Sequence, residues 1–152
     1  MNISQVMKFD VESCHVDDNL NMVAEKMSNR DVGCLPVINN SRQVIGMITD
    51  RDICMAAYKQ QKMLAGIAVS ASMSRELFAC HADDTVAKAE GMMRMHKVRR
   101  LPVIDTDGKL LGIVSLDDFA SEVERELSVR SHEITPQEVT ATLASVGRTR
   151  KQ

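Results

Sequence analysis

The chain has 152 residues, of which 44% are hydrophobic and 26% are charged, so its composition is that of one compact globular domain or two small ones. Its formal net charge of −2 and its low aromatic content of 3% argue against nucleic-acid binding. No apolar run approaches the roughly 20 residues that a membrane helix needs, and the N-terminus lacks a signal-peptide pattern. The four cysteines have no disulfide-type spacing, so we expect a cytoplasmic protein with no membrane or nucleic-acid partner.

One segment of the sequence occurs twice. Cys-His-Val-Asp-Asp-Asn-Leu at 14–20 returns as Cys-His-Ala-Asp-Asp-Thr-Val at 80–86, and Leu-Pro-Val-Ile at 35–38 returns at 101–104 without a change of register. Copies that keep one register share one fold, so a site in one copy is expected in the other, or between the two. We therefore divide the chain into a first repeat, 1–66, a second repeat, 67–127, and a C-terminal extension, 128–152.

Each repeat begins with a short lead that ends in a methionine, Met7 or Met73. An aspartate in position for a helix N-cap follows, Asp17 or Asp83. Apolar residues at helical spacing then predict a buried helix face, which in the first repeat consists of Leu20, Val23, Ala24 and Met27. The second repeat keeps this spacing, with Glu90 in the place of the alanine.

Short β-branched runs after this helix predict two strands and a second helix in each repeat. The predicted elements are strands at 34–38 and 44–48 with a helix at 50–60, and strands at 100–104 and 110–114 with a helix at 116–127. A proline inside the first strand of each pair indicates an edge strand or a strand start. Each repeat is therefore predicted to run helix, strand, strand, helix.

The C-terminal extension has its own pattern. Residues 128–133 are polar and predict a loop. Thr135 and Glu138 form a capping-box pattern, which predicts a short helix that ends near Val146. Residues 147–152 are short and basic, which is typical of a solvated chain end.

The second predicted strand of each repeat ends in a glycine, two apolar residues, a hydroxyl residue, two variable residues and an aspartate. These motif residues are Gly46, Thr49 and Asp52 in the first copy and Gly112, Ser115 and Asp118 in the second. Glycine permits close approach of a backbone or a ligand, the following helix N-terminus favours an anion, and a carboxylate can accept hydrogen bonds from a ribose diol. The alternative is that the hydroxyl only caps the helix and the aspartate only favours its dipole. Because the motif occurs twice, we favour a ligand site.

These features together resemble the cystathionine-β-synthase (CBS) domain, and the pair resembles a tandem CBS or Bateman module. The resemblance covers roughly 3–125 and rests on the methionine-ending leads, the paired aspartates, the two Leu-Pro-Val-Ile runs and the two motif copies. It implies an α/β (α+β) fold of two βαββα repeats packed with pseudo-two-fold symmetry, followed here by a short C-terminal helix.

The resemblance also implies a function. Clefts between the repeats would bind an adenosine nucleotide (AMP, ADP or ATP) or S-adenosylmethionine, with the motif hydroxyl at phosphate or ribose and the aspartate at the ribose diol. We therefore expect a regulatory ligand sensor rather than an enzyme, with no obligatory cofactor, a homodimeric assembly and an unknown effector protein. Fold and function separate easily, so the site residues have to carry this interpretation.

A basic pair, Arg99 and Arg100, precedes the second Leu-Pro-Val-Ile run. It resembles a phosphate-contacting pair of nucleotide-binding CBS proteins, although basic residues at a helix end are often only solvated. The first copy has Gly33 and Cys34 at these positions, and Arg51 is the candidate replacement cation. The two sites are therefore expected to differ in affinity or ligand.

Two alternatives remain for the function: a structural or protein-interaction module with empty clefts, and a metal- or redox-responsive protein that uses the Cys-His pairs. Paired cysteine and histidine can bind zinc, but neighbouring residues of a strand point to opposite faces. We expect Cys14 and Cys80 to be core residues and their histidines to lie in loops or at a cleft rim. Cys34 and Cys54 are also expected to pack internally.

Overall fold

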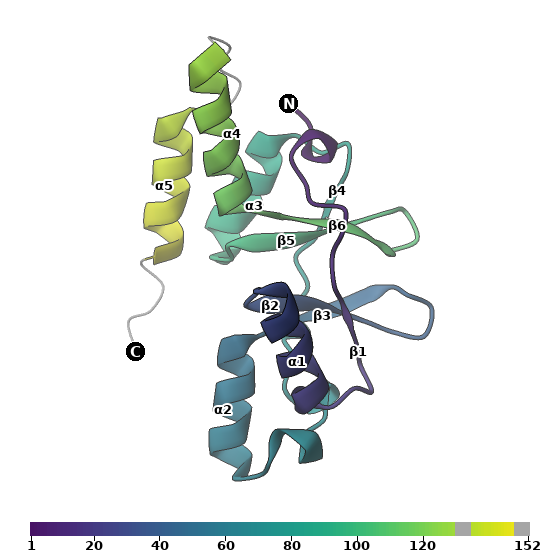
Figure 1. Ribbon diagram of the computed structural model, residues 1–152. Helices are drawn as coiled ribbons and strands as arrows, with labels where there is room; N and C mark the ends of the chain where they lie inside the picture. The colour runs from purple at the N-terminus through teal and green to yellow at the C-terminus, as the bar shows by residue number, and fades with distance from the viewer. Residues whose placement is uncertain (130–134, 148–152) are drawn as a thin grey trace. The chain divides into compact units, whose positions relative to one another are not determined.

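The computed structural model describes residues 1–129 and 135–147, and these residues form two compact units. The first-repeat unit consists of Val11–Leu77 and Asp107–Leu110. The second-repeat unit consists of Met1–Asp10, Phe78–Thr106 and the described part of Leu111–Gln152. Each unit contains one three-stranded sheet with helices packed on it (Figure 1), so the predicted mixed α/β fold is confirmed.

The two sheets share one topology. The first-repeat unit contains β1 (Cys14–His15), α1 (Leu20–Arg30), β2 (Cys34–Ile38), β3 (Val44–Thr49) and α2 (Asp50–Gln60). The equivalent elements of the second repeat are β4 (Cys80–His81), α3 (Val86–His96), β5 (Arg100–Ile104), β6 (Leu110–Ser115) and α4 (Leu116–Val129). The strand orders are β1-β2-β3 and β4-β5-β6, with the two-residue strand parallel to the middle one in each sheet. The predicted strands and helices of each repeat are thus confirmed.

The predicted N-caps are wrong by two residues. Asn19 caps α1 by accepting a hydrogen bond from the Met22 amide at 3.1 Å, and Thr85 caps α3 by accepting from the Lys88 amide at 3.2 Å. A turn separates each two-residue strand from its helix, so Asp17 and Asp83 lie too early to reach the first orphan amides.

The proline prediction is also wrong, because β2 and β5 are the middle strands of their sheets. The physical reason for the tolerance is local. Strand β1 pairs with Val37 and Ile38, whereas Pro36 pairs with Met47 of β3 alone. Pro36 thus lies in the part of β2 that is paired on one side only. Its missing amide hydrogen therefore interrupts no hydrogen bond between β2 and β1.

Of the predictions for the C-terminal extension, one is wrong, one is confirmed and the others lie outside the described residues. Helix α4 continues to Val129, so the loop predicted from Ser128 begins too early; the intervening sequence contains no glycine or proline that would end a helix. The rest of that predicted loop and residues 148–152 lie outside the described residues. The capping box is confirmed, since the amides of Thr135 and Glu138 each donate to the other's side chain at 3.0 and 3.3 Å and α5 (Pro136–Gly147) follows.

The lead segments are exchanged between the repeats. The lead of the first repeat, with the short 3-10 helix η1 (Ile3–Gln5), belongs to the second-repeat unit, where Ile3 and Met7 are buried. The lead of the second repeat belongs to the first-repeat unit, where Val69 and Met73 are buried. The compact units therefore do not follow the repeat boundaries at 66 and 67, because each core takes apolar side chains from the other repeat's lead.

Each lead crosses the third strand of its sheet at the motif glycine. A Cβ at Gly112 would lie 2.6 Å from the carbonyl oxygen of Lys8, and a Cβ at Gly46 would lie 2.3 Å from that of Ser74. Real Cβ atoms essentially never make contacts this short, and the atoms in the way are backbone atoms that a rotamer change cannot move. The glycines are therefore required by the crossing of two backbones.

Helix α3 carries a buried carboxyl group. Glu90 is 2% exposed, and among the described residues its Oε1 has no hydrogen-bond partner. Helix α5 packs against α3 and α4 in this unit (Figure 1), and the pKa of Glu90 is raised by burial and by the nearby charge of Glu138, with Arg94 opposing the shift. The equivalent residue in α1 is Ala24, so the cost of this burial is particular to the second repeat.

We predict opposite effects of adding a methyl group at two glycines of the second-repeat unit. Gly112→Ala should lower the free energy of unfolding by about 1–3 kcal/mol because it overpacks the crossing of the lead. Gly91→Ala, in the middle of α3 where a Cβ meets nothing within 4 Å, should raise it by up to about 1 kcal/mol. Chemical denaturation measures both, and equal effects at the two positions would contradict the crossing.

We also predict a pH-dependent gain from Glu90→Gln. A carboxyl whose pKa is raised in the folded protein binds its proton more tightly there, so its contribution to stability falls as the pH rises above the ordinary value of 4.5. The variant should therefore gain stability over the parent between pH 4 and 7, by about 1 kcal/mol at the upper end. Denaturation at several pH values measures this difference, and Glu76→Gln at an exposed position is the near-neutral control. A difference that shrinks with rising pH would refute the assignment.

Candidate functional site

Both copies of the motif lie where a strand passes directly into a helix. Thr49 ends β3 and is the N-cap of α2, with extended backbone angles (φ −119°, ψ 162°) that stop the helix from starting earlier. Ser115 ends β6 and immediately precedes α4. The hydroxyl residues thus occupy the junction that the sequence predicted for them.

The hydroxyl and the carboxylate of the first copy bind each other. The Thr49 hydroxyl donates to Oδ2 of Asp52 at 2.8 Å, and the Thr49 amide donates to the same oxygen at 2.9 Å. The Asp52 amide donates back to the Thr49 hydroxyl oxygen at 3.2 Å. This is a reciprocal capping box, so both side chains cap α2, and their additional role in ligand binding stays a prediction.

The second copy repeats the arrangement. The Ser115 hydroxyl and amide donate to Oδ2 of Asp118 at 2.6 and 2.8 Å, and the Asp118 amide donates to the Ser115 hydroxyl oxygen at 3.3 Å. Ser115 is buried, and the Asp118 side chain is largely buried. In both copies the cap therefore engages one carboxylate oxygen, Oδ2.

The other carboxylate oxygen distinguishes the two copies. Oδ1 of Asp118 lies 3.0 Å from Nζ of Lys8, in the lead that crosses β6. Oδ1 of Asp52 has no recorded partner within residues 1–129 and 135–147. Lys8 is a residue that the sequence reasoning missed, because it is remote from Asp118 in the chain. The sequence feature that could have identified Lys8 is its position directly after Met7, because the equivalent residue after Met73 is the uncharged Ser74.

The motif glycines have a role in the fold itself. Gly46 and Gly112 are buried in β3 and β6, where each faces the backbone of a lead. This close backbone contact accounts for both glycines without a ligand. Their assignment as ligand-contacting residues stays a prediction.

The predicted phosphate-binding arginines lie close to the second motif in the fold. The Arg99 carbonyl accepts a hydrogen bond from the Leu116 amide at 3.0 Å, which places the residue beside the first turn of α4. Arg99 and Arg100 both have exposed side chains, and Arg100 is the first residue of β5. Two cations therefore lie near the helix terminus that Ser115 begins, where a negative charge is favoured.

The first motif has a different charge at the equivalent place. Gly33 takes the position of Arg99, and its carbonyl accepts from the Asp50 amide at 3.0 Å. The Asp50 carboxylate lies close enough that an oxygen would be 3.1 Å from a Cβ at Gly33. Arg51, the candidate replacement cation, is exposed on the first turn of α2 between two aspartates. An anion is therefore favoured less here than at the second motif.

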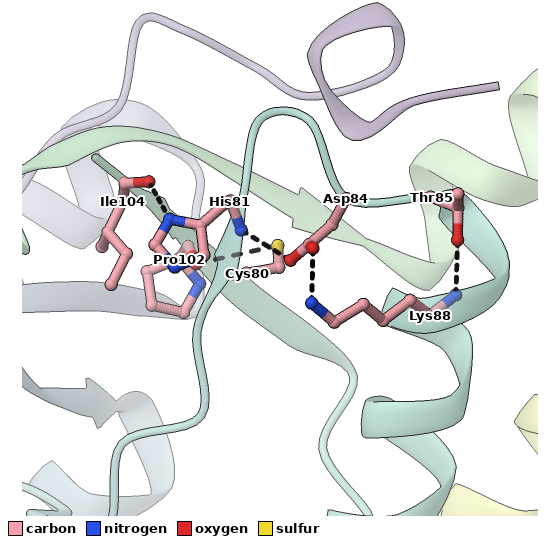
Figure 2. A network of polar contacts seen from close by, with 7 residues as sticks. All are labelled: Cys80, His81, Asp84, Thr85, Lys88, Pro102 and Ile104. Carbon is pink, nitrogen blue, oxygen red and sulfur yellow. Dashed lines mark hydrogen bonds and ion pairs between the residues drawn. The ribbon is translucent and has the colours of Figure 1, made fainter. Parts of the chain in front are cut away.

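In each Cys-His pair the cysteine packs in the core and the histidine backbone binds the aspartate of the following turn, as Figure 2 shows for the second copy. The thiol of Cys80 is buried against the Pro102 carbonyl, with Sγ and O 3.9 Å apart, and the His81 amide donates to Asp84 Oδ2 at 2.9 Å. Asp84 also pairs with Lys88, as Figure 2 shows. Burial, together with the Asp84 charge, raises the pKa of the Cys80 thiol to about 12.

The first copy has the same design at Cys14, whose thiol pKa burial also raises to about 12. Both cysteines are confirmed as core residues, and a thiol that remains protonated at neutral pH is a poor metal ligand or nucleophile. No cluster of three or more metal-ligating side chains occurs among the described residues. His15 and His81 end the two-residue strands β1 and β4 rather than lying in loops.

The remaining cysteines differ from each other. Cys34 is buried in β2 as predicted, but Cys54 is exposed on α2 and its predicted burial is wrong. The buried face of α2 is formed by Ile53 and Ala56, and the residue after Ile53 turns away from that face.

In the described part of the chain, no helix combines the length and the apolar composition needed to cross a bilayer.

The comparisons with known proteins agree with this architecture. The CBS domain family model matches twice, at residues 3–59 and 67–125. The CBS domain-containing protein YhcV of Bacillus subtilis is 31% identical over 119 residues, which cover 78% of this chain and 83% of YhcV. The match spans 61% of a relative from Methanopyrus kandleri.

Two solved structures have the same fold. The CBS domain pair of protein MJ0100, solved with 5′-methylthioadenosine and S-adenosyl-L-methionine, aligns with a TM-score of 0.72 and 20% identity over 80% of this chain and 98% of that one. Hypoxic Response Protein I, solved with two coordinated zinc ions, aligns with a TM-score of 0.73 and 26% identity over the same shares. Since the family model accounts for most of the chain in two consecutive copies, the protein belongs to the CBS domain family and carries its domain in tandem.

Proposed function

We propose that this protein is a regulatory module that binds an adenosine-containing ligand at its two motifs, with AMP, ADP or ATP as the candidate nucleotides. The observation that carries the proposal is the twofold carboxylate geometry. In each copy the cap occupies Oδ2 of the motif aspartate and holds the carboxylate at the start of a helix, while Oδ1 lies outside the cap. A carboxylate fixed in this way is preorganised to accept two further hydrogen bonds.

The chemistry of a ribose suits this carboxylate. Its 2′ and 3′ hydroxyls are neighbouring donors, and an ionised carboxylate is a stronger acceptor than a neutral group. The CBS domain pair of MJ0100 was solved with two adenosine-bearing ligands, which supports the ligand class. A regulatory role is proposed because the motif hydroxyls, Thr49 and Ser115, and their aspartates are accounted for by helix capping and ligand binding together.

The charges around the motifs support different ligands. Arg99 and Arg100 favour a phosphorylated ligand at the second motif, because cations and a helix N-terminus both attract phosphate. Asp50 stands near the first motif and disfavours a phosphate there. We therefore propose a nucleotide at the second motif and a less charged adenosine ligand at the first.

A sensor needs a recipient for its signal, and a ligand shifts an equilibrium only if it binds one arrangement better than another. We propose that a homodimer or an effector protein reads the bound ligand. Helix α2 exposes Met55 and Tyr58, with Tyr58 70% exposed, and such side chains are common in protein interfaces.

We predict that Asp118→Asn weakens AMP binding by about 1.5–3 kcal/mol, because the charge-assisted hydrogen bonds are lost. Asparagine retains an oxygen that can accept the capping bonds, so the fold should persist. Isothermal titration calorimetry measures the affinity, and Asp52→Asn is the matched variant of the first motif. If the double variant binds as the parent does, the carboxylates only cap their helices. If the parent binds none of AMP, ADP, ATP and S-adenosylmethionine, the interaction-module alternative is favoured.

We predict that Arg100→Ala weakens AMP binding more than adenosine binding, by about tenfold, because one charged contact to the phosphate is removed. Arg42→Ala, at an exposed turn outside both motifs, is the control for loss of a positive charge. Both ligands are titrated against each variant. Equal losses for AMP and adenosine would remove the phosphate role of Arg100.

A further inference from the structure

Lys8 and Ser74 occupy equivalent places in the two units. Each is the residue after the buried methionine of its lead, and each makes an antiparallel backbone pair with the third strand. Lys8 pairs with Ile113 through bonds of 2.9 and 3.0 Å, and Ser74 pairs with Met47 through bonds of 2.9 and 3.1 Å. The two residues therefore have the same backbone pairing at equivalent places in the two units.

The side chains themselves differ. Nζ of Lys8 lies 3.0 Å from Oδ1 of Asp118. The ammonium group thus pairs with the carboxylate oxygen that takes no part in the helix cap. The Asp118 side chain is 10% exposed, whereas that of Lys8 is 69% exposed. Ser74 carries no charge, and its hydroxyl donates to the Glu76 carbonyl at 3.5 Å instead. The lead thus supplies a cation to one motif and not to the other.

We infer that Lys8 is a specificity-determining residue that makes the second motif select phosphorylated ligands. The inference rests on the proposed function and adds a residue from outside both motifs. A neutral ribose that binds Asp118 has to share Oδ1 with the ammonium or displace it, and gains nothing from the charge. A nucleotide that displaces the ammonium from Oδ1 offers it a phosphate in exchange.

The energetics of the ion pair permit this exchange. The Lys8 side chain is largely exposed, and an ion pair with a solvated ammonium group is weak, so releasing Lys8 from Asp118 costs little. The lysine side chain has a flexible four-carbon stem and is largely exposed to solvent. Its ammonium group can therefore move to a phosphate while the lead backbone stays paired with β6. Lys8 then acts together with Arg99 and Arg100, which lie at the same end of α4.

The test exchanges the two residues. In an Asp52→Asn background, which leaves the second motif as the binding site, AMP and adenosine are titrated by calorimetry. Lys8→Ser should lower the ratio of AMP affinity to adenosine affinity by about fivefold. Lys8→Arg should preserve most of the ratio because it keeps the charge. Lys62→Ser, an exposed lysine outside both motifs, should leave the ratio unchanged.

The reciprocal variant tests the same inference at the other motif. In an Asp118→Asn background, Ser74→Lys should raise the AMP preference of the first motif by a similar factor. If Lys8→Ser changes neither ligand's affinity, or weakens both equally, the inference is overturned while the proposed function stands. If Lys8→Ser unfolds the protein, Lys8→Gln keeps the stem without the charge and gives the same readout. If the parent chain binds neither AMP nor adenosine, the inference about Lys8 is overturned. If it also binds none of ADP, ATP and S-adenosylmethionine, the proposed function is overturned as well.

Discussion

The structure depends on a backbone crossing that occurs once in each unit. A lead from one repeat pairs with the third strand of the other repeat's sheet, and the two backbones approach at Gly46 and Gly112 so closely that no Cβ fits. The crossing places the lead methionine in the core of each unit and, in the second-repeat unit, Lys8 beside Asp118. Core, sheet edge and candidate site in each unit are thus fixed by one contact between segments that are remote in the sequence.

The motif combines a structural role with the proposed ligand-binding role in a single pair of residues. The hydroxyl and Oδ2 of the aspartate satisfy the amides that open the helix, which a helix N-terminus requires whether or not a ligand binds. The same bonds orient the aspartate, and its second oxygen is the group that differs between the copies. A capping box and a ligand site are therefore compatible, because each uses a different oxygen of the same carboxylate.

Duplication gave the two repeats one backbone, and substitution gave them different charges. The second-repeat unit has Arg99, Arg100 and Lys8, whereas the first-repeat unit has Asp50 and Ser74. The buried Glu90 and the additional helix α5 are also confined to the second-repeat unit. The repeats are thus equivalent in architecture and unequal in electrostatics, and the proposal that the two motifs bind different ligands rests on this difference.

Helix periodicity, β-branched runs and the capping pattern at Thr135 were sufficient to predict the helices and the longer strands within one or two residues at most ends, whereas the two-residue strands β1 and β4 were not predicted from these patterns. These signals are local, because hydrophobic spacing and capping depend on neighbours in the chain. The N-caps at Asn19 and Thr85 were missed because the length of the preceding strand is set by its pairing, and Pro36 was misplaced because strand order is not a local property.

The sequence by itself determined that one unit occurs twice and that a hydroxyl and a carboxylate begin a helix in each copy. Only the tertiary structure decided which lead belongs to which core, why the motif glycines are required, and that Lys8 meets Asp118. The physical reason is that spacing along the chain fixes which face of a helix or strand a residue occupies. Contacts between remote segments depend instead on how the cores are shared, and no local pattern encodes that exchange.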